Sequence, residues 1–125
     1  MDSQRPVLLC AHRRSTFAAA LLNAGYVPLV REHIEQALRT LRHEQIEAVL
    51  VDARNAGVDA LEFVLNVRDV DRIVPILVAT SDETPEDLRP ALQGVPGVRL
   101  TEPDASPEKA VTGLERIVRA SETRS

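Results

Sequence analysis

The sequence predicts a single, doubly wound α/β domain with a parallel sheet of five strands and helices on both of its faces. Short apolar runs alternate along the chain with longer segments whose apolar residues recur at helical spacing. The runs are continuously apolar, which is typical of parallel strands buried between two layers of helices. With 125 residues, the chain is long enough for one such domain and too short for two.

The expected strands lie at 7–10, 27–30, 48–51, 76–79 and 98–101. The run that ends at Asp52 is the clearest central strand. Pro28 cannot donate a hydrogen bond to a neighbouring strand, so the second strand is expected near an edge of the sheet. Arg99 interrupts the last run, which makes it the weakest strand.

Five amphipathic segments, which are the expected helices, follow these strands. Ser15 or Thr16 is expected to cap the first, and Gly25 has the position of a residue just past its end. The second spans 34–43, the third is marked by residues 61–68, and the last opens at 106–108. The fourth is expected to start with Thr84 as its cap and Pro85 in its first position, and to be shortened or kinked by Pro90. The domain is therefore expected to span 1–120, with 121–125 as a polar tail or the start of a linker.

Composition excludes several classes of function. The net charge of -4 and the three aromatic residues argue against nucleic-acid binding, because a phosphate footprint needs basic residues and base stacking needs rings. One cysteine allows no disulfide framework and fits a reducing compartment. No apolar run approaches ~20 residues and the N-terminus is polar, so we expect no membrane span, no secretory signal and a cytoplasmic location.

A binding site in such a sheet is expected beyond the carboxyl ends of the strands. The residues there are 11–13, 52–54, 80–81 and 102–103. They include no pair of nucleophile and base and no cofactor motif, so an enzyme is the least supported interpretation. Cys10 lies inside an apolar strand and is expected to be a buried structural thiol.

Residues around Asp52 carry a family resemblance. The stretch 47–63, EAVLVDARNAGVDALEF, resembles the third strand, loop and helix start of bacterial response-regulator receiver domains. In that family the strand ends in a phosphoacceptor aspartate, whose position is taken here by Asp52, and Gly57, Asp59 and Leu61 fall in step with the loop.

Two further stretches extend the resemblance from Val7 to about Ala120. The run PILVATS at 75–81 is similar to the family's fourth strand, with Thr80 at the position of the switch hydroxyl, and LTEP at 100–103 resembles its Leu-Thr-Lys-Pro segment. The resemblance implies a flavodoxin-like, receiver-like fold and a role in two-component signal transduction.

The sequence departs from the family at the positions that carry its chemistry. The family's pair of acids at the end of the first strand, which binds Mg²⁺ with the phosphoacceptor, is replaced by Ala11 and His12. Glu102 stands in place of the family's lysine, and Arg99 in place of its aromatic switch residue.

These departures predict that Asp52 is not phosphorylated by the usual Mg²⁺-dependent route. Phosphoryl transfer to a carboxylate needs a metal and a cation to neutralise the transferring group, and Mg²⁺ prefers carboxylate oxygens. Glu102 is expected to place a negative charge where a cation is needed. We therefore expect no cofactor and lost or weak Mg²⁺ binding. Two alternatives remain for the basic residues: His12 or Arg13 pairs with Asp52 or Glu102 as a built-in cation, or the site has decayed and these side chains face solvent.

The predicted function is that of an atypical receiver, or pseudo-receiver, which acts through protein–protein contact. Its partner would be an output domain, a kinase or another signalling protein. The resemblance also implies a contact, including one between two copies, on the face formed by the fourth helix, fifth strand and fifth helix. The alternative is a functional phosphorelay receiver that a histidine kinase phosphorylates on Asp52.

Overall fold

The computed structural model describes residues 4–54 and 59–122, in which strands and helices alternate. The strands are β1 (Pro6–Cys10), β2 (Val27–Arg31), β3 (Ala48–Asp52), β4 (Ile76–Ala79) and β5 (Val98–Leu100). The helices are α1 (Thr16–Asn23), α2 (Ile34–His43), α3 (Ala60–Val70), α4 (Leu88–Gln93) and α5 (Pro107–Glu122). None of these helices is long and apolar enough to cross a membrane.

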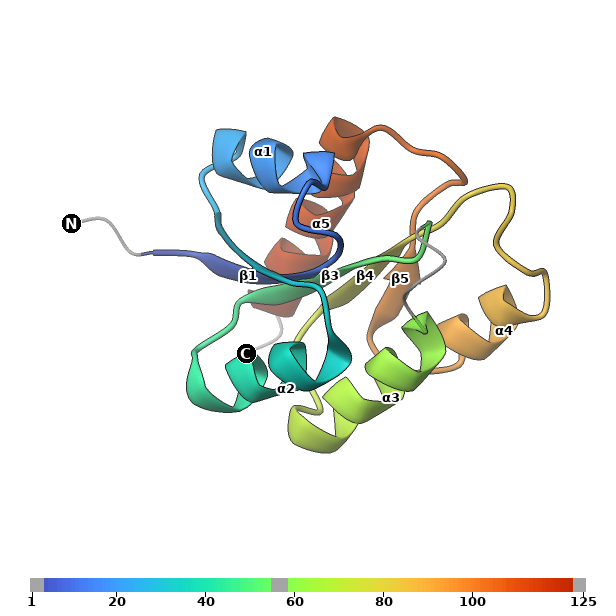
Figure 1. Ribbon diagram of the computed structural model, residues 1–125, viewed down its shortest axis with the longest axis horizontal. Helices are drawn as coiled ribbons and strands as arrows, with labels where there is room; N and C mark the ends of the chain where they lie inside the picture. The colour runs from blue at the N-terminus through green and yellow to red at the C-terminus, as the bar shows by residue number, and fades with distance from the viewer. Residues whose placement is uncertain (1–3, 55–58, 123–125) are drawn as a thin grey trace.

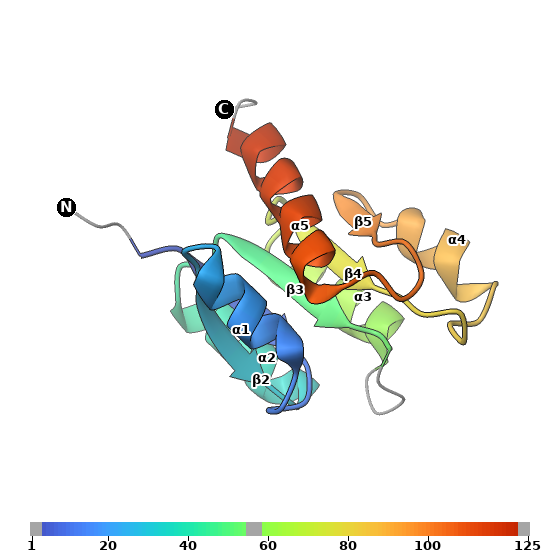
Figure 2. The same cartoon turned by 90° about the horizontal axis from the view of Figure 1, so that it is seen from above.

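The five strands form one parallel sheet in the order β2-β1-β3-β4-β5. Helices α1 and α5 cover one face of the sheet, and α2, α3 and α4 cover the other (Figure 1). Viewed from above, α1 and α5 lie side by side over the sheet (Figure 2). The predicted doubly wound α/β fold is therefore confirmed.

The apolar runs are continuous because each strand has a helical layer on both sides. In β1, Leu8 and Cys10 belong to the core on the side of α2, α3 and α4, whereas Val7 and Leu9 belong to the core on the side of α1 and α5. Every residue of β3 is buried. Burial of a leucine or valine side chain stabilises the fold by roughly 1.5–3 kcal/mol, so these two cores hold the sheet in its register.

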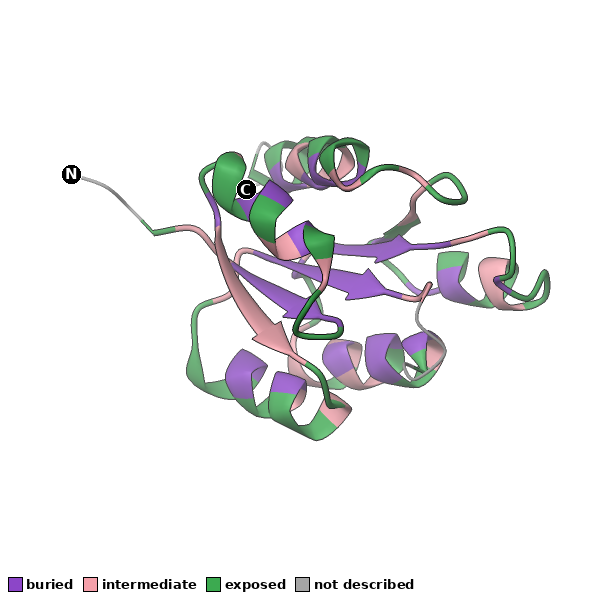
Figure 3. Cartoon of the chain, turned by 45° about the horizontal axis from the view of Figure 1, so that its top comes forward, coloured by how far each residue is buried: buried purple, intermediate pink, exposed green. Residues whose placement is uncertain are grey.

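Strand β2 lies at the edge of the sheet, as Pro28 predicts. All its residues are half-buried, and it is drawn pink beside the purple central strands in Figure 3. The Val27 N–H donates to the Arg5 carbonyl, 2.9 Å away, on the side of β1. Since neighbouring residues of a strand point their N–H groups in opposite directions, the nitrogen of Pro28 faces the open edge. The proline therefore costs no hydrogen bond within the sheet and removes a donor from the edge.

The residues expected at the two ends of α1 are confirmed, and α3 also has a capping residue. Ser15 caps α1, and its hydroxyl accepts a hydrogen bond from the Phe17 N–H at 3.2 Å. Gly25 follows α1 with a φ of 92°, a left-handed conformation that glycine adopts without strain. Asp59 caps α3 by accepting from the Glu62 N–H at 3.0 Å.

The predicted start of the fourth helix is wrong. Helix α4 begins at Leu88, and the Thr84 hydroxyl instead accepts a hydrogen bond from the Ser81 N–H at 3.0 Å within a turn. Pro90 lies in the first turn of α4, where backbone N–H groups have no acceptor within the helix, so the proline breaks no helical hydrogen bond. The helix has only six residues.

Smaller differences concern the C-terminal elements. Strand β5 stops at Leu100, one residue before its predicted end. Helix α5 runs to Glu122, so it includes two residues of the predicted polar tail. Gly57 lies outside the described residues.

Candidate functional site

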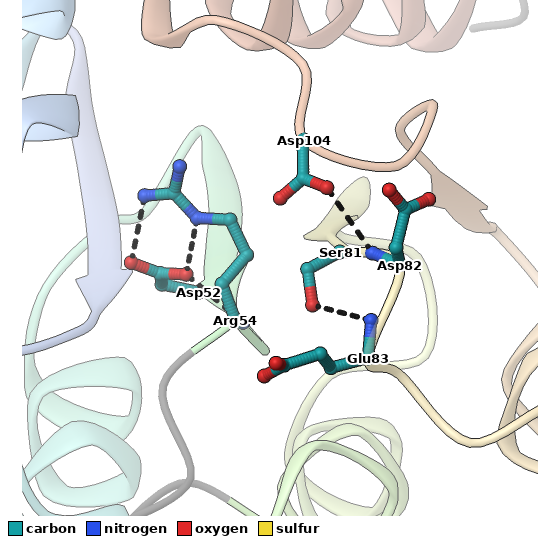
Figure 4. A pocket seen from close by; sticks show the side chains of 6 residues that line it. All are labelled: Asp52, Arg54, Ser81, Asp82, Glu83 and Asp104. Carbon is teal, nitrogen blue, oxygen red and sulfur yellow. Dashed lines mark hydrogen bonds and ion pairs between the residues drawn. The ribbon is translucent and has the colours of Figure 1, made fainter.

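An open cleft of about 560 Å³ lies at the carboxyl ends of β3, β4 and β5, where a sheet of this topology is expected to bind its ligands. The residues that line it are Asp52, Arg54, Ser81, Asp82, Glu83 and Asp104 (Figure 4). They come from the strand ends and from the loops after them, so the sheet itself brings together residues that are far apart in the sequence.

Asp52, the last residue of β3, forms an ion pair with the nearby Arg54. The residue is 6% exposed. The Arg54 Nε donates to Oδ1 at 2.9 Å, and Nη2 donates to Oδ2 at 3.2 Å, which forms a bidentate ion pair (Figure 4). The Arg54 backbone N–H also donates to Oδ1 at 3.1 Å. Both carboxylate oxygens therefore already have charge-assisted hydrogen bonds.

Phe17, from the first turn of α1, provides the platform on which Arg54 lies. The centre of the guanidinium is 4.3 Å from the centroid of the Phe17 ring, which is fully buried. The hydrogen bonds to Asp52 raise the pKa of Arg54; burial acts in the opposite direction, and the charges of Asp52 and Asp104 add to the rise. The guanidinium is therefore charged at neutral pH.

Acidic side chains form the rest of the cleft. Asp82 and Glu83 come from the loop after β4, and Asp104 comes from the loop after β5. The Asp82 N–H donates to the Asp104 carboxylate at 3.2 Å, and the Glu83 N–H donates to the Ser81 hydroxyl at 3.2 Å (Figure 4). Among the described residues that line the cleft, four are acidic and one, Arg54, is basic, so negative charges outnumber positive ones there.

The residues expected to supply a built-in cation lie elsewhere. The exposed His12 accepts a hydrogen bond from the Arg14 N–H at 3.1 Å, and its Nε2 is 3.8 Å from Glu32. Arg13 is also exposed. Of the two alternatives for these residues, a pair between His12 or Arg13 and Asp52 or Glu102 is wrong, because both residues are exposed, as the other alternative expects. The cation that pairs with Asp52 is Arg54. The sequence does contain the signal, because Arg54 lies two residues after Asp52, within the strand-end segment 52–54.

The expected role of Glu102 is corrected as well. Glu102 is exposed and does not line the cleft, and Asp104 does so in its place. Asp104 has a φ of 57°, and its N–H donates to the Thr80 carbonyl at 2.8 Å. This left-handed turn after β5 brings the Asp104 carboxylate to the cleft.

Thr80 and Arg99, the residues at the predicted switch positions, lie in different surroundings. The hydroxyl of the buried Thr80 donates to the Thr101 carbonyl at 3.1 Å, and the Thr80 N–H donates to the Thr101 hydroxyl at 3.0 Å. Both bonds join the end of β4 to the end of β5. Arg99 is exposed on β5. The hydroxyl and the N–H of Thr80 are therefore both used in hydrogen bonds to Thr101 across the sheet.

The residues at this strand edge do not fit a magnesium ion. Ala11, at the end of β1, is fully buried and has no side-chain oxygen to offer. The oxygens of Asp52 already accept from Arg54. Within residues 4–54 and 59–122, no three His, Cys, Asp or Glu side chains are grouped so that they could hold a metal. Mg²⁺ needs oxygen ligands in a near-octahedral arrangement, which this donor set does not supply.

Cys10 is fully buried in β1, as expected from its apolar surroundings. Burial, with a smaller contribution from the charge of Asp52, raises the pKa of its thiol to about 11. A thiol with this pKa is protonated at neutral pH and is a poor nucleophile.

Comparison with known proteins gives structural neighbours only, since no protein-family model and no curated protein matches the chain. A response regulator receiver protein from Sinorhizobium medicae has 20% identity and a TM-score of 0.77, over 94% of this chain and 97% of that one. The chemotaxis response regulator CheY4 of Vibrio cholerae has 22% identity and a TM-score of 0.75, over 92% and 99%.

A third neighbour is the receiver domain of a sensor histidine kinase from Pseudomonas aeruginosa, solved with a magnesium ion coordinated in its active site cleft. It has 20% identity and a TM-score of 0.76, over 94% of this chain and 99% of that one. At these identities the likeness shows the fold, so the chain has the flavodoxin-like fold of CheY-like receiver domains.

Proposed function

We propose that this protein is an atypical receiver domain, a pseudo-receiver, which acts in signal transduction through protein–protein contact and without Mg²⁺-dependent phosphorylation of Asp52. The observation that carries the proposal is the bidentate pair between Arg54 and Asp52 in a chain with the receiver fold. The position that holds the phosphoacceptor in receiver domains is filled here by an internal ion pair.

Chemistry at Asp52 supports the absence of phosphorylation. A carboxylate that attacks a phosphoryl donor must present a free oxygen, and a metal or cation must neutralise the oxygens of the transferring group. Both oxygens of Asp52 are hydrogen-bonded to Arg54, and Ala11 removes a carboxylate from the end of β1. The acids Asp82, Glu83 and Asp104 would repel a phosphoryl group.

The proposed partner is a protein: an output domain, a kinase, another signalling protein or a second copy. The net charge of -4 disfavours nucleic acid as a partner. By analogy with receiver domains, the contact surface is the face formed by α4, β5 and α5. On this face α4 is only six residues long and Arg99 is exposed on β5, so the partner would differ in shape and charge from those of typical receivers. We also propose a cytoplasmic, bacterial setting for this signalling role, and no catalytic activity.

The second candidate is a functional phosphorelay receiver that accepts a phosphoryl group on Asp52. Two observations favour it: Asp52 stands at the end of β3 beside an open cleft, and the Arg54 side chain is 28% exposed. In that case the guanidinium would have to leave the carboxylate before transfer.

Intact-mass spectrometry separates the two candidates. The protein is incubated with acetyl phosphate, or with beryllofluoride for NMR, in the presence of MgCl2. The pseudo-receiver predicts no added phosphoryl mass and unchanged amide shifts. Asp52→Asn removes the acceptor, and Asp69→Asn makes the same change at an exposed carboxylate of α3 as the matched control. A phosphoryl adduct that Asp52→Asn abolishes and Asp69→Asn retains would refute the proposed function.

A further inference from the structure

We infer that Arg54 is an internal cation that keeps divalent metal ions away from Asp52, and that Phe17 is the positioning residue that holds it there. The inference rests on the proposed function, since both concern the Arg54–Asp52 pair. It goes further because it assigns part of the exclusion of metal ions, beside the missing carboxylate at Ala11, to one side chain whose removal would let metal ions approach Asp52.

Geometry at Asp52 supports a direct competition. The guanidinium and a divalent metal would need the same carboxylate oxygens, and Arg54 holds both of them at 2.9 and 3.2 Å. Arg54 is also tethered only two residues from Asp52, and its backbone N–H fixes Oδ1 at 3.1 Å. A tethered cation binds at a high effective concentration, so a metal in solution competes poorly with it.

Phe17 restricts where the guanidinium can lie. Its ring is buried in the core formed with α5 and lies 4.3 Å from the guanidinium centre. Stacking of a planar cation on an aromatic face is favourable, and the buried ring has little freedom to move. Phe17 thus couples the start of α1 to the end of β3 through Arg54.

The surrounding charges predict the effect of removing Arg54. Asp52 would then be a buried carboxylate with no cation, beside a cleft whose other charged residues are Asp82, Glu83 and Asp104. A hard divalent cation is the species that such oxygen ligands attract. Even without a preformed set of three ligands, the affinity of this edge for metal is expected to rise.

The test uses Mn²⁺ as a paramagnetic probe of the whole chain. Amide line broadening is followed by NMR during a MnCl2 titration of the wild type and of Arg54→Met. The wild type is expected to show no broadening centred on Asp52. Arg54→Met is expected to show it at Asp52 and at the loops after β4 and β5, with an apparent affinity at least about tenfold higher. Arg54→Gln gives the same comparison if the methionine variant does not fold.

Matched variants separate the roles of the two side chains. Arg14→Met removes an exposed arginine from a neighbouring loop and is expected to leave the titration unchanged. Asp52→Asn in the Arg54→Met background is expected to abolish the new broadening. Phe17→Leu is expected to give a smaller gain than Arg54→Met, whereas Phe63→Leu, a similar loss in the other core, is expected to give none.

Two outcomes would overturn the inference. Equal broadening at Asp52 in the wild type and in Arg54→Met would mean that the guanidinium does not exclude metal. No broadening at Asp52 in either protein would mean that Arg54 is not what closes the site. Phosphorylation of the wild type is a separate measurement, so failure of the proposed function is distinguishable from failure of this inference.

Discussion

The ion pair between Arg54 and Asp52 is expected to be a measurable source of stability. Asp52 is 9% and Arg54 28% exposed in their side chains, so the pair is much better shielded from water than an ordinary surface salt bridge. Arg54→Met leaves a buried carboxylate without its partner, which costs about 1.5–3 kcal/mol. Loss of the contact with Phe17 adds about 0.5–1 kcal/mol. We therefore expect the free energy of unfolding to fall by about 2–4 kcal/mol in this variant.

Asp52→Asn is expected to cost less, about 1 kcal/mol, because the partly exposed guanidinium can be hydrated and the amide oxygen still accepts a hydrogen bond. A double-mutant cycle with Arg54→Met and Asp52→Asn should then give a coupling free energy of about 1 kcal/mol, since Asp52→Asn costs little once Arg54 has been replaced. Urea unfolding of the four proteins, followed by circular dichroism, measures this quantity.

The pair between Arg119 and Glu115 provides the control. It lies on the surface of α5, with side chains 78% and 32% exposed and a separation of 3.9 Å. Its coupling is expected to be below about 0.5 kcal/mol. If the Arg54–Asp52 cycle gives a coupling no larger than this control, the pair is not a shielded interaction and Asp52 cannot be regarded as an occupied site.

Three further predictions concern the scaffold. The raised pKa of Cys10, about 11 against an ordinary 9.0, means that the unfolded chain loses this proton first as the pH rises. The thiol's contribution is therefore complete below about pH 9 and is lost as the pH rises through about 11; urea unfolding across this range should show a smaller loss for Cys10→Ala than for the wild type. Gly97→Ala is expected to lower the unfolding free energy by about 1–3 kcal/mol, because a Cβ there would lie 2.5 Å from Arg68 Nη2 at a φ of 75°; a thermal midpoint equal to the wild type's would contradict this. Ser15→Ala removes the cap of α1 and is expected to cost about 1 kcal/mol in the same unfolding assay, whereas Ser15→Asp should retain most of the stability.

Much of the fold could be predicted from the sequence because its signals are local. A continuously apolar strand such as β3 requires cover on both faces, whatever the rest of the chain does. Pro28 at an edge and Ser15 at a helix start follow from the donors and acceptors of single residues. The start of α4 could not be predicted in this way, because a threonine hydroxyl can cap a helix or accept a hydrogen bond within a turn. The Thr84 hydroxyl does the second, accepting from the Ser81 N–H.

The place of the candidate site was equally predictable, because the carboxyl ends of parallel strands meet at one edge of the sheet. The identity of its charges was not. The arginine two residues beyond Asp52 turns back onto it with its guanidinium against the Phe17 ring, which α1 supplies from a distant part of the chain.

The sequence by itself thus determined the order of strands and helices, the edge position of β2 and the location of Asp52 at a strand end, since these depend on apolar periodicity and on single-residue chemistry. Only the tertiary structure decided that Arg54 is the cation on Asp52 and that Asp104, and not Glu102, lines the cleft. The physical reason is that side-chain direction depends on backbone turns and on packing partners far away in the chain, which no local pattern records.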